Sequence, residues 1–496
     1  MNKFYITTTL PYVNAPPHIG FALEIIQADV IARHRVILGK EVFFNTGTDE
    51  HGLKIYQKAL EEKKKPKDYC DEYAAKFDLL KEKLNLSYNS FIRTTDPHHV
   101  KAAQEFWERC RANGDIYKKD YKTKYCIGCE LEKTDSELVD GKCPIHPDRK
   151  IEIIDEENYF FRFSKYQKAL LKFYDANPNF VIPAYRQKEI YNFVKSGLRD
   201  FSISRLKTKM PWGVAVPEDN DHVMYVWFDA LVNYISCLGW PGNQKKFESF
   251  WGTKKKPNAI QVAGKDNLRQ QTAMWQAMLM SAGLPNSKQV FIHGFINLAG
   301  QKISKSSSVS LPNPVELVNK YGIDPVRYYL LREIPAYEDG DFSIKRFEER
   351  YNADLANGLG NLVARVLTLA AKSKVPAKGE ARQGRQSPKS KVRDEIIQKE
   401  VVEIHKNYKE HMGEFKFHEA LKEIWELISF CDGYVEENKP WQLAKTDKKK
   451  LEQVLSNLLY CISEIANLVE PFLPETSERI KRQLESKKPE TLFPRL

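Results

Sequence analysis

The feature that most constrains the fold of this chain is an alternation of strand-like and helix-like segments at its start. Residues 4–10 (FYITTTL) form a short apolar run that predicts a strand. Residues 21–39 (FALEIIQADVIARHRVILG) carry apolar positions at helical spacing, with Gly39 where the helix should end. Residues 41–52 (EVFFNTGTDEHG) predict a second strand that ends in a polar loop. Strand, helix and strand in this order predict a parallel βαβ unit and therefore an α/β domain.

This alternation is interrupted and then resumes. Residues 114–219 contain a cysteine-rich segment and several short strand patterns, and the α/β pattern returns in 222–235, 258–266 and 289–295. An interruption followed by a return predicts a domain inserted into the α/β sheet. From about residue 346 the chain is nearly all helical in pattern.

One basic segment breaks the C-terminal helical pattern. Residues 371–393 carry eight Lys or Arg against one Glu, with two prolines. This composition predicts a solvated loop between helices. A loop that contacts phosphates is the alternative interpretation.

Length and composition narrow the class of protein. The chain has 496 residues, enough for about three domains. Its mean hydropathy is −0.53, and no run approaches the ~20 apolar residues of a membrane span. The N-terminus turns polar too early for a secretory signal, so we expect a soluble cytoplasmic protein. The net charge of +11 is compatible with a polyanionic partner but does not require one.

Four residues have the spacing of a metal site. Cys126, Cys129, Cys143 and His146 give the pattern C-x2-C-x13-C-x2-H. Two such knuckles bring four ligands into a tetrahedron around Zn²⁺, and a fully protein-ligated site is structural. We interpret the remaining cysteines as buried free thiols: Cys70, Cys110, Cys237, Cys431 and Cys461.

Two further segments have the chemistry of a phosphate site. His18 and Gly20 follow the first strand, where a helix N-terminus offers free N–H groups and glycine allows close approach. Residues 300–308 (GQKISKSSS) place Lys302 and Lys305 three apart among serines, which suits a polyphosphate. A plain strand–helix turn and a solvated loop are the respective alternatives.

Together the two segments resemble the HIGH and KMSKS signatures of class I aminoacyl-tRNA synthetases, and more narrowly those of the bacterial-type methionyl-tRNA synthetase family. Further segments match that family in order: TLPYVN (9–14), GTDEHG (47–52), ENYFFR (157–162), YVWFDAL (225–231), GKD (264–266), KISKS (302–306) and the helical tail. The resemblance implies two halves of a Rossmann-type catalytic domain (1–113 and 220–299), a zinc-bearing connective insertion (114–219), a linker domain (300–345) and an α-helical anticodon-binding domain (346–496).

The resemblance also implies the reaction and its residues. Methionine and ATP, with Mg²⁺, would give methionyl-adenylate and pyrophosphate, and the methionyl group would pass to the 3′ end of the methionine tRNA. His18, Lys302 and Lys305 are the expected catalytic residues. ATP would be bound by His18, Gly20, Lys302, Ser304 and Lys305. The implied methionine pocket consists of Leu10, Tyr12, Asp49, Trp227, Ala230, Tyr234 and Gln271. The implied anticodon contacts are Asn361, Arg365 and Trp441.

Two positions depart from the family pattern. The second His of HIGH is Phe21, which cannot donate to a phosphate, and Gln271 stands where the family commonly has His. These departures keep two alternatives open: a tRNA-binding paralogue with impaired catalysis, and a class I synthetase for another apolar amino acid. The second usually carries a larger editing insertion than the one expected here. Because the chain stops shortly after its helical tail, we expect a monomer.

Overall fold

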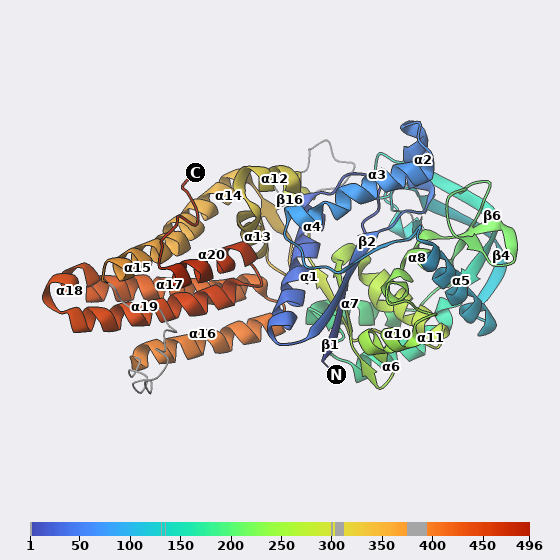
Figure 1. Cartoon of the computed structure of the whole chain (residues 1–496). Helices are drawn as coiled ribbons and strands as arrows, with labels where there is room; N and C mark the ends of the chain where they lie inside the picture. Colours follow the sequence, from blue (N-terminus) through green and yellow to red (C-terminus); the bar gives the residue numbers. More distant parts are fainter. Residues whose placement is uncertain (1, 130, 134, 299–300, 303–311, 374–393) are drawn as a thin grey trace. The chain divides into compact units, whose positions relative to one another are not determined.

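The computed structural model describes residues 2–129, 131–133, 135–298, 301–302, 312–373 and 394–496 (Figure 1). The chain divides into two compact units. The first unit comprises residues 1–16, 40–79 and 88–292, and the second comprises residues 17–39, 80–87 and 293–496. No described helix is both long and apolar enough to cross a membrane.

The first unit is built on a six-stranded sheet with the order β3-β2-β1-β14-β15-β7. Neighbouring strands run parallel wherever their register is defined, with Tyr5 between Phe43 and Ala259 in the centre. The predicted α/β fold is therefore confirmed. The strands are β1 (Lys3–Thr8), β2 (Glu41–Thr48), β3 (Ser90–Arg93), β7 (Val181–Ile182), β14 (Ala259–Gly264) and β15 (Gln289–His293).

The segment expected as an insertion builds a sheet of its own. Strands β4 (Ile116–Cys126) and β6 (Ile151–Phe161) pair antiparallel along their whole length in a four-stranded sheet with β5 (Leu131–Lys133) and β8 (Phe201–Ser202). Strand β7 lies within the same expected range, yet it pairs with β15 in the main sheet. The insertion boundaries at 114 and 219 stay a prediction, and one short strand between them contributes to the main sheet.

The α/β pattern does not resume at 222–235 with a strand of the main sheet. Strand β11 (Asp219–Met224) pairs antiparallel with β9 (Ser204–Leu206) and β10 (Ala215–Val216) in a separate three-stranded sheet. Two short helices follow it, α8 (Val226–Ala230) and α9 (Asn233–Ser236). This places the YVWFDAL segment on a helix rather than on a strand.

Aromatic side chains fill the core beneath α8. Phe106 on α5 (Pro97–Ala112) contacts Phe228, Trp240 and Trp275, with ring centroids 5.5–6.0 Å apart. All four rings are buried. Truncating such a ring to alanine costs about 3–5 kcal/mol, so these contacts stabilise the core against which α8 packs.

The second unit contains a helix that precedes most of its partners in sequence. In α1 (Ile19–Ile37) the eleven residues from Ala22 to Ala32 are all buried, which includes every face of the helix. Among them Glu24 bonds His293, with Oε2 and Nε2 2.9 Å apart. A helix buried on every face depends on its tertiary contacts.

A buried ion pair joins α1 to the rest of the second unit. Arg327, on α13 (Ile323–Arg332), is fully buried and donates to Asp29 Oδ2 of α1 at 2.7 Å. Its other N–H groups donate to the backbone carbonyls of Leu84, Pro471 and Phe472 at 2.7–3.1 Å. Although burial raises the pKa of the Asp29 carboxyl, the nearby guanidinium groups lower it below its usual value.

The remainder of the second unit is mainly helical. A three-stranded sheet with the order β17-β16-β18 consists of β16 (Ile296–Leu298), β17 (Gln301–Lys302) and β18 (Gly340–Phe342). In the C-terminal part, helix α19 contacts each of α15, α16, α17, α18 and α20 (Figure 1). The helices are α12 (Pro314–Tyr321), α14 (Ile344–Arg350), α15 (Asn361–Lys372), α16 (Glu395–Gly413), α17 (Phe417–Asn438), α18 (Pro440–Thr446), α19 (Lys448–Val469) and α20 (Pro474–Ser486).

Candidate functional site

Two of the predicted pocket residues meet at the carboxyl edge of the main sheet. Tyr12 follows β1 and Asp49 follows β2, and the two residues form an isolated parallel bridge. Asp49 N–H donates to the Pro11 carbonyl at 3.0 Å, and Val13 N–H donates to the Asp49 carbonyl at 3.2 Å. In an open α/β sheet this edge is where ligands bind. Backbone pairing therefore fixes Asp49 at the position expected for a ligand contact.

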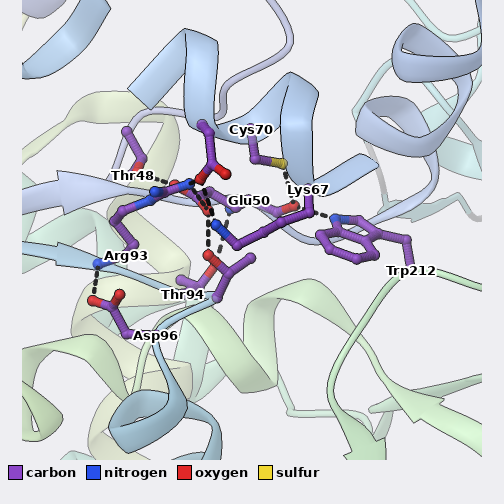
Figure 2. A network of polar contacts seen from close by, with 10 residues as sticks. Thr48, Glu50, Lys67, Cys70, Arg93, Thr94, Asp96 and Trp212 are labelled. Atoms are coloured by element: carbon purple, nitrogen blue, oxygen red, sulfur yellow. Dashed lines mark hydrogen bonds and ion pairs between the residues drawn. The ribbon is translucent and has the colours of Figure 1, made fainter. Parts of the chain in front are cut away.

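The next residue, Glu50, is held in a buried network that Figure 2 shows from close by. Its carboxylate has no exposed surface and accepts from Arg93 Nε at 2.6 Å and Arg93 Nη2 at 2.9 Å. The hydroxyls of Thr48 and Thr95 donate to the same carboxylate at 2.6 and 2.5 Å. A bidentate arginine with two hydroxyl donors satisfies a buried carboxylate, which would otherwise be costly to bury.

The backbone of Glu50 is also fully bonded. Its N–H donates to Thr94 Oγ1 at 2.9 Å, and its carbonyl accepts from Trp212 Nε1 at 2.6 Å and from the Cys70 thiol at 3.5 Å (Figure 2). Both neighbours of Glu50 in the chain are titratable, Asp49 and His51. Because the backbone and the carboxylate of Glu50 are both held by hydrogen bonds, the backbone on either side, which carries Asp49 and His51, is held in place.

His51 links this loop to α8. Its Nδ1 lies 2.6 Å from Asp229 Oδ2, and the other carboxylate oxygen of Asp229 lies 2.8 Å from His99 Nε2. His99 Nδ1 in turn lies 2.9 Å from the hydroxyl of Ser236. Burial raises the pKa of the Asp229 carboxyl, but charge attraction and hydrogen bonds from His51 and His99 lower it overall to about 2. The carboxylate is therefore ionised at neutral pH and bridges the loop to the helix.

Helix α8 presents two of the predicted pocket residues, Trp227 and Ala230. The buried Trp227 Nε1 has no acceptor among the described residues. The Leu10 side chain packs against the apolar core of the same unit. These residues belong to the first unit, as do Tyr12 and Asp49.

The departure at Gln271 is accommodated by a hydrogen-bonded chain of side chains. Gln271 lies in a π-helical turn (η4, Gln270–Met274), and its Nε2 donates to the Tyr234 hydroxyl at 2.6 Å. Its Oε1 accepts from Gln261 Nε2 at 2.9 Å. All three side chains are buried. The structure thus brings Tyr234 and Gln271 together, and the amide supplies both a donor and an acceptor.

The HIG turn lies at the start of α1 in the second unit. His18 is the N-cap residue, and its Nδ1 accepts from Gly20 N–H at 3.1 Å. An accepting Nδ1 places the proton of a neutral imidazole on Nε2, which makes Nε2 a donor. A Cβ on Gly20 would lie 3.0 Å from His18 Cε1. We expect glycine here to allow close approach of a ligand, and the structure shows that it also makes room for the His18 ring.

The lysine segment is described only at its start. Lys302 lies in β17 and pairs with Asn297 of β16. Ser304 and Lys305 lie outside the described residues, so their roles stay a prediction.

The four predicted metal ligands meet in the first unit. All their ligand atoms lie within 4.8 Å of one another. Cys129 Sγ lies 3.4 Å from Cys143 Sγ and 3.3 Å from His146 Nδ1, and Cys126 Sγ lies 3.9 Å from the same nitrogen. A tetrahedron with Zn–S bonds of ~2.3 Å and a Zn–N bond of ~2.0 Å requires ligand separations of ~3.5–3.8 Å. The donor set and its spacing therefore fit a zinc ion.

The knuckle geometry depends on one glycine. A Cβ on Gly128 would lie 2.4 Å from the His146 ring, so no other residue fits there without displacing the ring. The Gly128 carbonyl accepts from Lys54 Nζ of α2 (Leu53–Glu61) at 2.7 Å. This bond ties the knuckle to the helix that follows the GTDEHG loop.

The expected anticodon residues gather in the second unit. Asn361 and Arg365 are one turn apart on α15, and residues at this spacing share a helix face. The Arg365 Cζ lies 5.1 Å from the Trp441 ring centroid, and Arg365 Nη2 bonds Glu436 at 2.5 Å. Trp441 is 39% exposed, so part of this residue is accessible to a partner.

The sequence analysis missed the residues that position the candidate pocket. Glu50, His51 and Asp229 are buried and charged or polar, but their partners come from distant segments. A signal was present: three consecutive titratable residues, Asp49 to His51, directly follow a buried strand.

Comparisons with known proteins agree on one family. A family model described as tRNA synthetases class I (M) matches residues 4–151 and 145–367, and one described as the anticodon-binding domain of tRNA ligase matches residues 394–494. A methionine–tRNA ligase of Thermotoga maritima is 42% identical over 489 residues, which is 97% of this chain and 75% of the relative. A methionine–tRNA ligase of Thermosynechococcus vestitus is 41% identical over 493 residues, which is 97% of this chain and 90% of the relative.

Solved structures give the same result. The structure of Mycobacterium tuberculosis methionyl-tRNA synthetase in complex with methionyl-adenylate matches with a TM-score of 0.90 and 35% identity, covering 100% of this chain and 98% of that one. The apo form of the same protein matches with a TM-score of 0.83 and 33% identity, again covering 100% and 98%.

Proposed function

We infer, because this chain belongs to the methionine–tRNA ligase family of class I tRNA synthetases, that it activates L-methionine with ATP and transfers it to the methionine tRNA. In the first step a methionine carboxylate oxygen attacks the α-phosphorus of ATP, and the bond to the bridging oxygen breaks to release pyrophosphate. In the second step a terminal ribose hydroxyl of the tRNA attacks the adenylate carbonyl, loses its proton and releases AMP.

The observation that carries this proposal is the fixed placement of Asp49 and α8 in the first unit. Asp49 is paired through its backbone, and the Glu50 network and the His51–Asp229 contact hold its loop to α8. We propose that Asp49 binds the methionine ammonium while Trp227 and Ala230 line the side-chain pocket. Catalysis by orientation requires such fixed positions, because misplacement of the reactants is costly in rate.

We propose that the side-chain pocket also includes Leu10, Tyr12, Tyr234 and Gln271. The aromatic rings suit the polarizable sulfur of methionine. The hydrogen bond from Gln271 to Tyr234 supports a role in fixing that ring. A neutral amide at this position adds no charge to an apolar pocket.

For ATP, we propose that the Nε2–H of His18 donates to a phosphate and that Gly20 shapes the turn. Lys302 and Lys305 would neutralise the charge that develops on the leaving pyrophosphate, and Ser304 would bind ATP, with Mg²⁺ bound to the nucleotide. Phe21 offers no donor, so the lysines carry the larger share of this stabilisation.

We propose that Asn361, Arg365 and Trp441 recognise the anticodon, with Trp441 stacking on an unpaired base and the other two bonding to base edges. Cys126, Cys129, Cys143 and His146 would hold one Zn²⁺ in a structural role. A monomeric state and a cytoplasmic location remain predictions.

The proposed function is tested by methionine-dependent ATP–pyrophosphate exchange, followed by charging of the methionine tRNA. We expect exchange with methionine and none of comparable rate with leucine, isoleucine or valine. Exchange that follows one of those three instead would indicate a synthetase for another apolar amino acid. Binding of tRNA without any exchange would indicate a paralogue that has lost catalysis. Matched Asp49→Asn and Asp49→Ala variants should both raise the KM for methionine.

A further inference from the structure

A buried pair of titratable side chains connects the turn that holds His18 with the segment that leads to Lys302. Glu24 lies on α1 one turn after Gly20 and on the same face of the helix. Its Oε2 lies 2.9 Å from His293 Nε2, and both side chains are buried. All five residues belong to the second unit. The contact therefore joins two segments of the proposed phosphate site within one unit.

The surroundings of His293 determine where its protons lie. Its Nδ1 lies 2.7 Å from the carbonyl oxygen of Gly294, which can only accept, so Nδ1 carries a proton. At Nε2, a ring nitrogen without a proton would direct its lone pair at the carboxylate oxygen of Glu24, so this contact must also contain a proton. Both ring nitrogens are thus engaged in hydrogen bonds, which fixes the plane of the imidazole.

Stability alone does not account for a buried pair of this kind. Removing a carboxylate and an imidazole from water is costly, and apolar side chains of similar volume often stabilise a core as well or better. A fully bonded polar pair adds rigidity, because its bonds are directional. The contact between Glu24 and His293 is therefore suited to hold α1 in one position against the segment that begins at His293.

The segment that follows this histidine is held by its own neighbours as far as Lys302. Phe295 N–H donates to Asp339 Oδ1 at 2.9 Å, and the Phe295 carbonyl accepts from Gly340 N–H at 2.9 Å. Strand β16 then pairs in parallel with β18, and Asn297 of β16 pairs with Lys302 of β17. A shift at the histidine would therefore be passed on to the backbone of Lys302.

We propose that Glu24 and His293 are positioning residues, which hold the HIG turn and the backbone of Lys302 at a fixed separation so that both segments act on the same polyphosphate. This inference rests on the proposed function, because it takes ATP to be bound by these two segments. Two groups accelerate one reaction together only when both are correctly placed, and a misplacement of about 1 Å can cost about a hundredfold in rate.

Position 293 allows a matched pair of variants. In His293→Asn the amide nitrogen takes the place of Nδ1, so the bond to the Gly294 carbonyl can form while the contact with Glu24 is lost. In His293→Gln the longer side chain brings its amide nitrogen close to the position of Nε2, so the contact with Glu24 can form instead. Both variants remove the imidazole, and they differ in which of its two bonds survives.

The test is ATP–pyrophosphate exchange by the full chain, with calorimetric titration of methionine to give its Kd and the number of competent sites. In H293N we expect kcat per methionine-binding site to fall about tenfold to a hundredfold. The Kd and KM for methionine should stay within about twofold of wild type, and H293Q should recover kcat to within about threefold. Loss of stability alone would lower the number of sites and leave kcat per site unchanged.

Two further variants separate positioning from stability. Asp29→Asn weakens the other buried ion pair of α1, with Arg327, and should lower the unfolding temperature while kcat per site stays near wild type. E24L/H293L replaces both partners by apolar side chains, so it should keep much of the stability. It should nevertheless be as slow as H293N, because the directional contact is gone.

Equal kcat values in H293N and H293Q would overturn the inference, as would a wild-type kcat in E24L/H293L. A Kd for methionine that rises in step with the loss of kcat would also overturn it, because the defect would then not be confined to the ATP segments. If H293N does not fold, the comparison of H293Q with E24L/H293L decides in its place. Exchange by the wild type alongside such results would leave the proposed function intact, whereas a wild type without exchange would refute the proposed function and the inference with it.

Discussion

At the scale of single residues, the buried carboxylate of Asp229 makes a definite contribution to stability. It has no exposed surface, and its two histidine partners lie 2.6 and 2.8 Å away. Its pKa in the folded chain is about 2, against 3.8 when unperturbed. The unfolded chain therefore binds the proton more readily, and folding is favoured where the carboxylate is ionised, by about 2 kcal/mol.

This contribution should be present above pH 4 and lost as the pH falls from about 4 to about 2. Asp229→Asn should lower the free energy of unfolding at pH 7, and its difference from wild type should shrink through that acid range. Urea unfolding of both proteins at a series of pH values measures it. A difference that stays constant down to pH 2 would contradict the linkage.

Gln271 allows a second prediction at this scale. Gln271→Leu leaves the Tyr234 hydroxyl and the Gln261 amide without their partner, and each unsatisfied buried group costs about 1–3 kcal/mol. We expect a fall of about 2–4 kcal/mol in unfolding free energy and a higher KM for methionine. Gln271→His is the matched control, because imidazole can still bond the hydroxyl. The prediction fails if both variants are equally stable.

Residues of the candidate sites could be predicted from the sequence where a short spacing pattern identifies them. Cys126 and its partner ligands follow from spacing alone, whereas Asp49 was expected only because its segment resembles the family. The partnership of His51 with Asp229 could not be predicted, because 178 residues separate the two in sequence and only the tertiary fold brings them together. Burial of Glu50 is likewise a property of the packed loop and not of the local pattern.

At the scale of elements, long periodic segments were predictable and short ones were not. The helix at 21–39 and the strands at 4–10 and 41–52 correspond to α1, β1 and β2. β3 has four residues and β7 has two, too few to show a period. Such strands are defined by their neighbours in the sheet, which the sequence pattern does not reveal.

The zinc knuckle supports a prediction at the scale of elements. Cys126→Ser with Cys143→Ser should remove about one equivalent of zinc, because each knuckle loses a ligand. Hydrogen exchange should then accelerate in β4 to β6, while the six-stranded sheet keeps its protection. Cys110→Ser with Cys237→Ser, outside the knuckle, is the control and should retain the metal. Full zinc content in the knuckle variant would disprove the site.

At the scale of the whole molecule, neither compact unit is a continuous stretch of chain. The second unit begins with residues 17–39 and is completed only by residues 293–496. A fragment that ends at Ile292 therefore contains α1 without His293 and Arg327, the partners of Glu24 and Asp29.

We expect α1 to lose its hydrogen-exchange protection in such a fragment, because eleven consecutive residues that are buried in the full chain include the two that lose these partners. Co-expression of residues 293–496 should restore protection. If exchange in residues 19–37 is as slow in the isolated fragment as in the full chain, then α1 does not depend on residues 293–496.

The separation of Asp29 and Arg327 in sequence also has a consequence for how the chain folds while it is being synthesised. These residues are 298 positions apart, so at ~5–20 residues per second Asp29 is made about 15–60 s before the arginine that pairs with it. For most of that interval α1 is complete while its partners His293 and Arg327 have not yet been made. We therefore expect α1 to be a site for chaperones that bind exposed apolar segments of a nascent chain, until the segment around Arg327 has emerged and can pair with Asp29.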